Sequence, residues 1–111
     1  MEKLDFAKGN GLIPVVVQDV VTHQVLMLGY MNHEAVEKTV ASNQVTFFSR
    51  SKQRIWTKGE SSGNTLAVAS IHVDCDFDTL LIRATPAGPV CHTGDATCFH
   101  DDRIEDSRFL G

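Results

Sequence analysis

The sequence lacks an apolar N-terminal segment of the kind that directs a chain to export or into a membrane. Its first residues, MEKLDFAKGNGLIP (1–14), mix charged side chains with glycine. A signal peptide needs a continuous apolar core, and a membrane-spanning helix needs about 20 apolar residues in succession. We therefore expect a soluble, cytoplasmic chain that does not engage a membrane.

An excess of positive charge is also missing. The chain has 10 Lys and Arg residues against 14 Asp and Glu residues, which gives a formal net charge of -4 at pH 7. Proteins that bind duplex nucleic acid usually carry an excess of cations, because they neutralise phosphates along the duplex. The composition argues against a nucleic-acid polymer as the partner, so any anionic ligand has to be met by a local group of cations.

Cysteine is sparse and odd in number. The sequence has three cysteines, at Cys75, Cys91 and Cys98. An odd number fits poorly with a closed disulfide framework and better with reduced thiols that are available to a metal. An intermolecular disulfide is the other interpretation.

Internal repeats, low-complexity tracts and linkers are absent from the sequence, in which apolar segments alternate with short stretches of turn-forming residues. A chain of 111 residues buries only about two-thirds of the surface that its unfolded form exposes, so a second independent core is not expected. The whole chain, 1–111, is predicted to form one domain.

Several apolar segments have the composition of β-strands. VVVQDV (15–20) and QVLMLGY (24–30) are rich in β-branched and large apolar residues, and only a short VTH separates them, which predicts a hairpin. Three further segments are strand candidates: VTFFSRS (45–51), TLAVASIHV (65–73) and TLLIRAT (79–85).

The hydrophobic period changes after the hairpin. Asn32 can cap a helix over roughly His33–Ser42, and Asn43 is a plausible end for it. The inward face of this helix is expected to carry Ala35, Val36 and Val40. The predicted fold class is α+β, with a mainly antiparallel β-sheet and one or two helices against it.

The stretch HVDCDFDTLL (72–81) has carboxylates at every second position and a thiol between the first two. If it is extended, Asp74, Asp76 and Asp78 share one face and Cys75 points to the other, since strand side chains alternate. Carboxylate oxygens suit Mg²⁺ or Ca²⁺, whereas a thiolate prefers Zn²⁺. The segment can therefore serve two metals, or it can be a solvated acidic turn between two strands, because Asp favours turns.

A second stretch with thiols, GPVCHTGDATCF (88–99), follows the last strand candidate. Six residues separate Cys91 from Cys98, which is not the spacing of a zinc ribbon. Together with Cys75 they number three, and three protein ligands with an open fourth position are typical of a catalytic zinc, which activates water at neutral pH. A metallohydrolase is one interpretation, and ordinary buried cysteines are the other.

Two histidines lie near these candidate ligands. His92 follows Cys91 directly, where it can take a proton from water or give one to a leaving nitrogen, and we choose it as the candidate catalytic residue. It can also be a turn histidine. His72 is the second candidate, although it can belong to the sheet surface. The other histidines, which have no neighbours that argue for chemistry, are His23, His33 and His100.

Local basicity is concentrated in FFSRSKQRIWTKGESSGN (47–64). Arg50, Lys52 and Arg54 recur at period two, so in a strand they form a positive row that can contact phosphate or can protect a sheet edge from aggregation. Trp56 can stack on a base, and the KGESSGN loop has the glycines, hydroxyls and N–H groups that bind phosphate, although GESSGN can be only a turn. The candidate substrate-binding residues are Arg50, Arg54, Trp56, Lys58, Gly59, Glu60, Ser61, Ser62, Gly63 and Asn64.

Three of these stretches, FFSRSKQRIWTKGESSGN, VDCDFDTLLI and GPVCHTGDATCF, closely resemble phosphoribosyl-AMP cyclohydrolases in their order and spacing, and YMNHEAVEKT (30–39) is similar to the start of that family's helix. The resemblance covers nearly the whole chain. It implies a zinc-dependent hydrolase of histidine biosynthesis that opens the purine ring of phosphoribosyl-AMP to the phosphoribosyl-formimino-imidazolecarboxamide intermediate.

The resemblance also implies an assembly and its metal ligands. It implies an intertwined homodimer in which Cys75 of one subunit and Cys91 with Cys98 of the other hold zinc. The carboxylates that it assigns to Mg²⁺ are Asp74, Asp76 and Asp78. The substrate has two separate phosphate groups, so the basic segment has a natural target on an acidic protein.

Some members of this family carry a second, pyrophosphohydrolase domain after the last cysteine. Here the acidic tail HDDRIEDSRFLG (100–111) occupies that position. We therefore expect that second activity to be absent.

Two other functions would use the same residue types. A zinc nucleoside or nucleotide deaminase also activates water, but its signature pairs H-x-E with P-C-x-x-C, and NHEA and GPVC supply neither spacing. A non-catalytic, zinc-stabilised binding module would need a closed site with His72 or His92 as the fourth ligand. Metal stoichiometry and activity on a purine nucleotide distinguish these alternatives.

Overall fold

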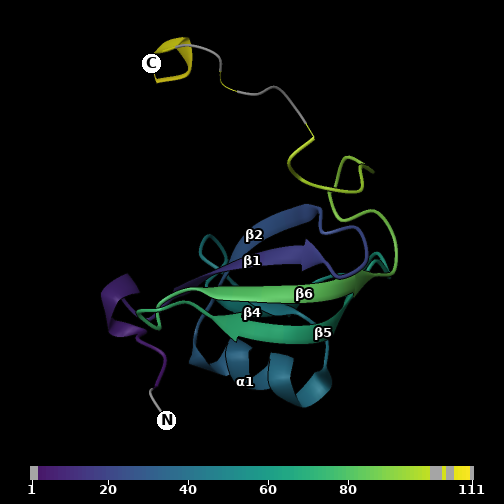
Figure 1. Cartoon of the computed structure of the whole chain (residues 1–111). Coiled ribbons are helices and arrows are strands. Elements are labelled where there is room, and N and C mark those ends of the chain that lie inside the picture. Colours follow the sequence, from purple (N-terminus) through teal and green to yellow (C-terminus); the bar gives the residue numbers. More distant parts are fainter. Residues whose placement is uncertain (1–2, 101–103, 105–106, 111) are drawn as a thin grey trace.

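In the computed structural model, which describes residues 3–100, 104 and 107–110, six strands and one α-helix surround an apolar core (Figure 1). The strands are β1 (Ile13–Asp19), β2 (Val25–Met31), β3 (Thr46–Ser49), β4 (Arg54–Thr57), β5 (Leu66–Val73) and β6 (Leu80–Pro86). The helix α1 (His33–Ser42) lies between β2 and β3 in the chain, and two short 3₁₀ helices, η1 (Ala7–Gly9) and η2 (Ser107–Leu110), lie near the ends. None of the helices in this described part is long and apolar enough to cross a membrane.

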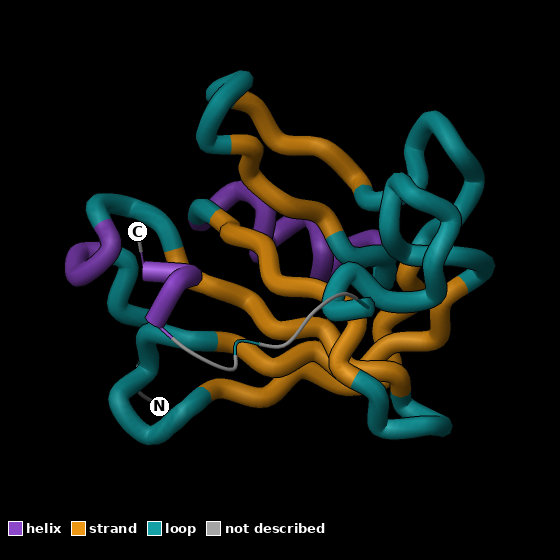
Figure 2. The backbone as a smooth tube through the Cα atoms, turned by 90° about the horizontal axis from the view of Figure 1, so that it is seen from above, coloured by secondary structure: helices purple, strands orange, loops and turns teal. Residues whose placement is uncertain are grey.

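The main sheet has four strands in the order β2-β1-β6-β5. β1 and β2 form an antiparallel hairpin, β5 and β6 form another, and β1 joins the two hairpins by pairing in parallel with β6. β3 and β4 form a separate antiparallel pair. Figure 2 views the sheet from above and shows α1 beneath it. The predicted α+β class, the mainly antiparallel sheet and the first hairpin are confirmed.

The core follows the alternation expected of strands that bury one face. On β1 the buried side chains are Ile13, Val15 and Val17, and on β6 they are Leu80, Ile82 and Ala84. Phe47 of β3 joins this core from the smaller sheet, and its aromatic ring packs 5.6 Å from that of Trp56 on β4. The buried Phe47 thereby packs the smaller sheet onto the core and supports Trp56 from within it.

The region 50–54 differs from the prediction. The strand candidate 45–51 ends at Ser49, and residues 50–53 form a turn in which the N–H of Gln53 donates to the Ser49 carbonyl at 2.8 Å. Gln53 has a left-handed φ of 54°, a conformation that ends a strand, so β4 starts only at Arg54. The predicted positive row of Arg50, Lys52 and Arg54 on one strand face is therefore wrong.

Both ends of α1 lie where they were predicted. The side chain of Asn32 accepts a hydrogen bond from the N–H of Ala35 at 2.9 Å, and Asn43 ends the helix with a left-handed φ of 61°. Ala35 is buried, as predicted, and Val36 packs partly against the core. Val40 was expected to face inward as well, but it is 65% exposed.

Thr39 takes the buried position that was predicted for Val40 and is 1% exposed. Its hydroxyl donates to the Ala35 carbonyl at 2.8 Å and accepts from the Thr46 N–H at 3.0 Å. A polar side chain can occupy this core position because both of its hydrogen-bonding functions are satisfied. The same contact ties the last turns of α1 to the start of β3.

We predict that Thr39→Val lowers the free energy of unfolding by about 1–3 kcal/mol, because the buried N–H of Thr46 loses its acceptor. Thr39→Ser keeps the hydroxyl and removes one methyl group, so it should cost less, about 1 kcal/mol. Denaturant unfolding of both variants measures the difference. A Val variant that is as stable as the wild type, beside a weakened Ser variant, would show that the methyl group matters and the hydrogen bond does not.

Candidate active site

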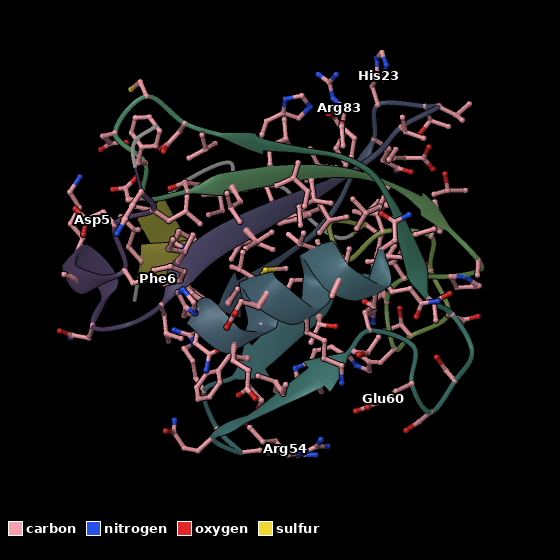
Figure 3. All side chains as sticks on the ribbon, turned by 90° about the horizontal axis from the view of Figure 1, so that it is seen from below. Asp5, Phe6, His23, Arg54, Glu60 and Arg83 are labelled. Carbon is pink, nitrogen blue, oxygen red and sulfur yellow. The ribbon has the colours of Figure 1, made fainter. Side chains whose placement is uncertain are left out.

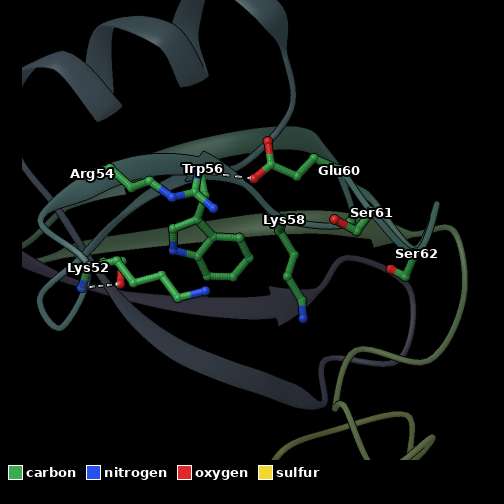
Figure 4. Close-up of a pocket in the computed structure, with 9 residues that line it drawn as sticks. Lys52, Arg54, Trp56, Lys58, Glu60, Ser61 and Ser62 are labelled. Carbon is green, nitrogen blue, oxygen red and sulfur yellow. Dashed lines mark hydrogen bonds and ion pairs between the residues drawn. The ribbon is translucent and has the colours of Figure 1, made fainter.

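A pocket of about 400 Å³ opens beside β4 and the loop that follows it (Figure 4). Its lining residues are Ser49, Lys52, Arg54, Trp56, Lys58, Gly59, Glu60, Ser61 and Ser62. Most of the candidate substrate-binding residues are among them. The pocket therefore joins the turn before β4, the strand itself and the loop after it.

Three candidates do not line the pocket. Arg50 turns away from it and stacks its guanidinium 4.0 Å from the centre of the Tyr30 ring. Gly63 and Asn64 follow the lining part of the loop. Conversely, Ser49 lines the pocket but was not a candidate, because nothing in the sequence marks the last residue of β3 as different from its neighbours.

The pocket combines an aromatic wall with cations and hydroxyls. The ammonium group of Lys58 lies 5.8 Å from the centre of the Trp56 ring, and in Figure 4 the Lys58 side chain extends past that ring. Arg54 pairs with Glu60 across the pocket at 3.6 Å. An exposed indole face suits stacking on a base, and cations beside hydroxyls suit phosphate oxygens.

The glycine that begins the pocket loop is required by its backbone. Gly59 has a φ of 85°, and a Cβ at this position would overlap the backbone of Asn64. Its carbonyl accepts a hydrogen bond from the N–H of Gly63 at 2.7 Å, which closes the loop. Gly63 also has a positive φ, 81°, but open space surrounds it.

Two of the thiols lie together after β6. The chain here folds back onto β2, where the Cys98 N–H donates to the Leu26 carbonyl at 2.8 Å and the Thr97 hydroxyl donates to the Val25 carbonyl at 2.7 Å. Cys91 is buried and Cys98 is exposed, and neither forms a disulfide. The alternative interpretation as ordinary buried cysteines therefore agrees with the burial of Cys91 but not with the exposure of Cys98.

The thiols influence each other and reach the pocket. Hydrogen bonding from Thr93 and His100 lowers the pKa of the Cys91 thiol to about 6, so it is largely a thiolate at neutral pH. Partial removal from water and the neighbouring Cys91 raise the pKa of Cys98, while the positive charge of Lys58 acts in the opposite direction. Lys58 is thus a shared neighbour of the thiol pair and of the Trp56 wall.

Cys75 lies elsewhere in the chain. It is exposed in the turn between β5 and β6, whereas Cys91 comes after the end of β6. β6 has seven residues, so roughly 20 Å of extended strand separates the two segments. In the part of the chain that the structure describes, no third His, Cys, Asp or Glu completes a group with Cys91 and Cys98.

The acidic stretch forms a turn between β5 and β6, which was one of its two interpretations, and not the extended segment that would place Cys75 on the opposite face. Phe77 has a left-handed φ of 61°, and its N–H donates to the Asp74 carbonyl at 3.2 Å. The Asp74 carboxylate accepts from the N–H groups of Asp78 and Thr79 at 3.1 and 3.2 Å. This turn still gathers the three carboxylates: one oxygen from each of Asp74, Asp76 and Asp78 lies within 4.8 Å of the others.

A lysine from the start of the chain lies over this acidic turn. The ammonium group of Lys8 is 3.0 Å from Asp76 Oδ2 and 3.1 Å from Asp78 Oδ2. These carboxylates raise the pKa of Lys8, and the ammonium group in turn holds the pKa of Asp76 below its usual value. No pattern in the sequence indicated this contact, because Lys8 and Asp76 lie 68 positions apart.

The two candidate histidines lie in different regions. His92 is exposed, and its Nδ1 is 3.9 Å from the sulfur of Cys91. His72 is exposed on β5, where its Nε2 is 2.9 Å from the Ser70 hydroxyl. His92 is therefore placed beside the thiol pair, and His72 lies on the strand that leads into the acidic turn.

The remaining histidines also have defined neighbours. His100 is 3.4 Å from Asp95 and 3.3 Å from the Thr93 hydroxyl, so it belongs to the surroundings of Cys91, which its position in the tail did not indicate. His33 pairs with Glu37 on α1. Figure 3 shows His23 on the opposite side of the molecule from Arg54 and Glu60.

The family of this chain follows from comparison with known proteins. Residues 27–100 match the family model for phosphoribosyl-AMP cyclohydrolase. The chain belongs to this family. The matched region includes the pocket loop, the acidic turn and all three cysteines.

Curated relatives agree with this family assignment. The chain is 61% identical over 108 residues, 97% of its length, to the histidine biosynthesis bifunctional protein HisIE of Bacteroides thetaiotaomicron. It is 62% identical over 99 residues, 89% of its length, to the protein of the same name from Escherichia coli, and 54% identical over 109 residues, 98% of its length, to that of Vibrio cholerae. These alignments cover 53%, 49% and 52% of the relatives, so the chain spans about half their length.

We predict that Gly59→Ala destabilises the folded chain more than Gly63→Ala does. Both variants force a side chain into a positive φ, which costs on the order of 1–3 kcal/mol, but only the Gly59 variant also overlaps the Asn64 backbone. The unfolding free energies of the two variants give the comparison. Equal losses would mean that the loop moves freely enough to remove the overlap.

Proposed function

We propose that this chain catalyses the hydrolytic opening of the purine ring of phosphoribosyl-AMP, a step of histidine biosynthesis. The observation that carries the proposal is the pocket of Trp56, cations and hydroxyls, whose Lys58 also acts on the thiol pair of Cys91 and Cys98, in a chain of the cyclohydrolase family. The names of the curated relatives place them in histidine biosynthesis, which supports the same step.

The pocket residues have separate roles in binding this substrate. The indole of Trp56 offers a flat face for the purine base, and its packing on Phe47 holds it in place. Lys52, Lys58 and the loop hydroxyls of Ser61 and Ser62 are available to phosphate oxygens, whereas Arg54 is paired with Glu60. The substrate is a small nucleotide, so local cations suffice on a chain with a net charge of -4.

The thiols suit a zinc ion. Cys91 is largely a thiolate at neutral pH and Cys98 lies next to it, and soft sulfur ligands select zinc. Two thiols leave the ligand set incomplete, and Cys75 of the same chain is on the far side of β6. We infer that Cys75 of the partner subunit completes the set in an intertwined homodimer. When bound, zinc supplies the Lewis acidity that makes water a nucleophile at neutral pH.

The acidic turn suits a magnesium ion. Asp74, Asp76 and Asp78 converge, and carboxylate oxygens are the hard ligands that Mg²⁺ prefers. The turn is exposed, so coordinating water molecules have access to it. Because this turn also carries Cys75, the same dimer would bring the magnesium ligands of one subunit to the zinc ligands of the other.

The residues of the chain can complete the hydrolysis around the bound substrate. Water adds to carbon six of the purine, and the bond between that carbon and the neighbouring ring nitrogen breaks. The nitrogen leaves with the electron pair of this bond and needs a proton. His92 is exposed beside the thiol pair, where its imidazole can deliver that proton, so it is the proposed general acid. The exocyclic nitrogen stays attached, so ring opening occurs without deamination.

An assay for ring opening of phosphoribosyl-AMP tests the proposed function directly. We expect turnover that a chelator abolishes and that zinc restores. Cys91→Ser and Cys98→Ser should each lose zinc and turnover, because a neutral hydroxyl cannot replace a thiolate ligand. Elemental analysis of zinc in the purified variants is the second measurement.

Val40→Ser is a matched control, since Val40 is exposed on α1, outside the pocket lining and the thiol-bearing segments, and should keep full zinc and full turnover. Release of ammonia instead of ring opening would identify a deaminase. Zinc without any turnover would favour the non-catalytic binding module. Full zinc and full activity in either Cys variant would refute the proposed ligand set.

Subunit complementation tests the shared site. We predict that Cys75→Ala and Cys91→Ala chains are each inactive and regain activity when their subunits exchange. A mixed dimer has one intact site, with Cys75 from the Cys91→Ala chain and with Cys91 and Cys98 from the Cys75→Ala chain. Random pairing makes half of the dimers mixed, so activity should return to roughly a quarter of the wild-type value.

Mass spectrometry of differently tagged chains first shows that exchange has taken place. If exchange occurs and no activity returns, the three thiols do not come from two chains. Recovery well above a quarter would show that mixed dimers are preferred over random pairs, with the shared site still in place.

A further inference from the structure

The start of the chain is docked on the acidic turn by more than one contact. The Asp5 N–H donates to the Phe77 carbonyl at 2.7 Å, and the Asp5 carboxylate accepts from the Lys8 N–H at 3.2 Å. The ring of Phe6 packs 5.6 Å from that of His33 at the start of α1, and Figure 3 shows Phe6 at this end of the helix. The backbone that carries Lys8 is therefore held against the turn independently of the lysine side chain.

The Lys8 side chain uses the oxygens that a metal would need. Its ammonium group contacts Oδ2 of Asp76 and Oδ2 of Asp78. Asp74 Oδ1 is occupied by the N–H groups of the turn, and Asp78 Oδ1 accepts from the Thr79 hydroxyl at 3.2 Å. The carboxylate oxygens that Lys8 contacts are thus among those which the hydrogen bonds within the turn leave free.

An ammonium group and a divalent cation cannot share these two oxygens. Mg²⁺ binds carboxylate oxygens at about 2.0–2.1 Å in near-ideal octahedral geometry, and it tolerates little distortion. A lysine nitrogen 3.0 and 3.1 Å from the same oxygens would occupy the space of a coordinating water and would repel the ion. Binding of the ion through Asp76 Oδ2 and Asp78 Oδ2 therefore requires Lys8 to move.

We propose that Lys8 is a tethered competitor for the acidic turn, which lowers its affinity for Mg²⁺ and is displaced when the ion binds. The inference rests on the magnesium site of the proposed function. In the metal-free protein Lys8 offsets the repulsion among the carboxylates, so the turn is already gathered before an ion arrives. The cost of displacing Lys8 then weakens binding of the ion.

Isothermal titration calorimetry with Mg²⁺ alone tests this competition on the full chain. Mg²⁺ is the suitable probe because thiolates bind it poorly, so the cysteines should not contribute. Lys8→Met removes the charge and keeps an unbranched side chain. Lys38→Met is the matched control, since it makes the same change in net charge at an exposed position of α1. Asp76→Asn identifies the site, and constant ionic strength keeps screening equal.

We expect Lys8→Met to bind Mg²⁺ about three- to tenfold more tightly than the wild type, which is the range that two exposed ion pairs provide. Lys38→Met should bind as the wild type does, and Asp76→Asn should bind much more weakly. In the wild type, the NMR signal of the Lys8 ammonium group should shift as Mg²⁺ is added, with the same midpoint as the calorimetric titration.

The outcomes separate this inference from the proposed function. Unchanged or weaker binding by Lys8→Met would overturn the inference and leave the magnesium site standing, because Lys8 would then be neutral or would help to arrange the ligands. Equal tightening in Lys38→Met would overturn it in favour of a general charge effect. Absence of Mg²⁺ binding in every variant, or unaltered binding in Asp76→Asn, would overturn both the inference and the magnesium site.

Discussion

Strand β6 is hydrogen-bonded on one side to β1 and on the other to β5, and its two ends carry the two thiol-bearing segments. The acidic turn with Cys75 precedes the strand, and the loop with Cys91 and Cys98 follows it. A strand with both edges paired cannot bend enough to bring its ends together. This constraint keeps Cys75 apart from Cys91 and Cys98 of the same chain.

The pocket depends on how the smaller sheet is fixed to the core. Phe47 is buried and supports Trp56 through a ring contact, while the Lys58 N–H donates to the Val45 carbonyl at 3.0 Å. The buried hydroxyl of Thr39 joins α1 to β3 behind them. Trp56 and Lys58 are therefore held by the core, whereas Ser61 and Ser62 belong to a loop that Gly59 turns sharply. A side chain held by the core suits stacking on a base, and a loop at the surface suits contacts with phosphate.

Electrostatics differ between the two candidate metal sites. The thiol pair lies among Thr93, His100 and Lys58, which stabilise the thiolate of Cys91 or act on its neighbour. The acidic turn instead concentrates negative charge that Lys8 partly offsets from outside. The first group offers soft sulfur donors, and the second offers hard oxygen donors.

The sequence by itself determined the elements whose signals are local. Alternating apolar residues placed β1 and β6, the side chains of Asn32 and Asn43 set the ends of α1, and the order and spacing of three motifs indicated the family. These signals need only a few neighbouring residues, because side-chain alternation along a strand and capping of a helix depend on residues close in the sequence.

Tertiary structure decided the rest. The left-handed residue Gln53 changed an expected strand segment into a turn, and the left-handed Phe77 decided between the two conformations that the sequence left open for the acidic stretch. Packing against β3 buried Thr39 in place of Val40, and chain folding brought Lys8 to Asp76 across 68 residues. Such contacts depend on which segments the sheet topology brings together, and no local pattern of residues specifies that.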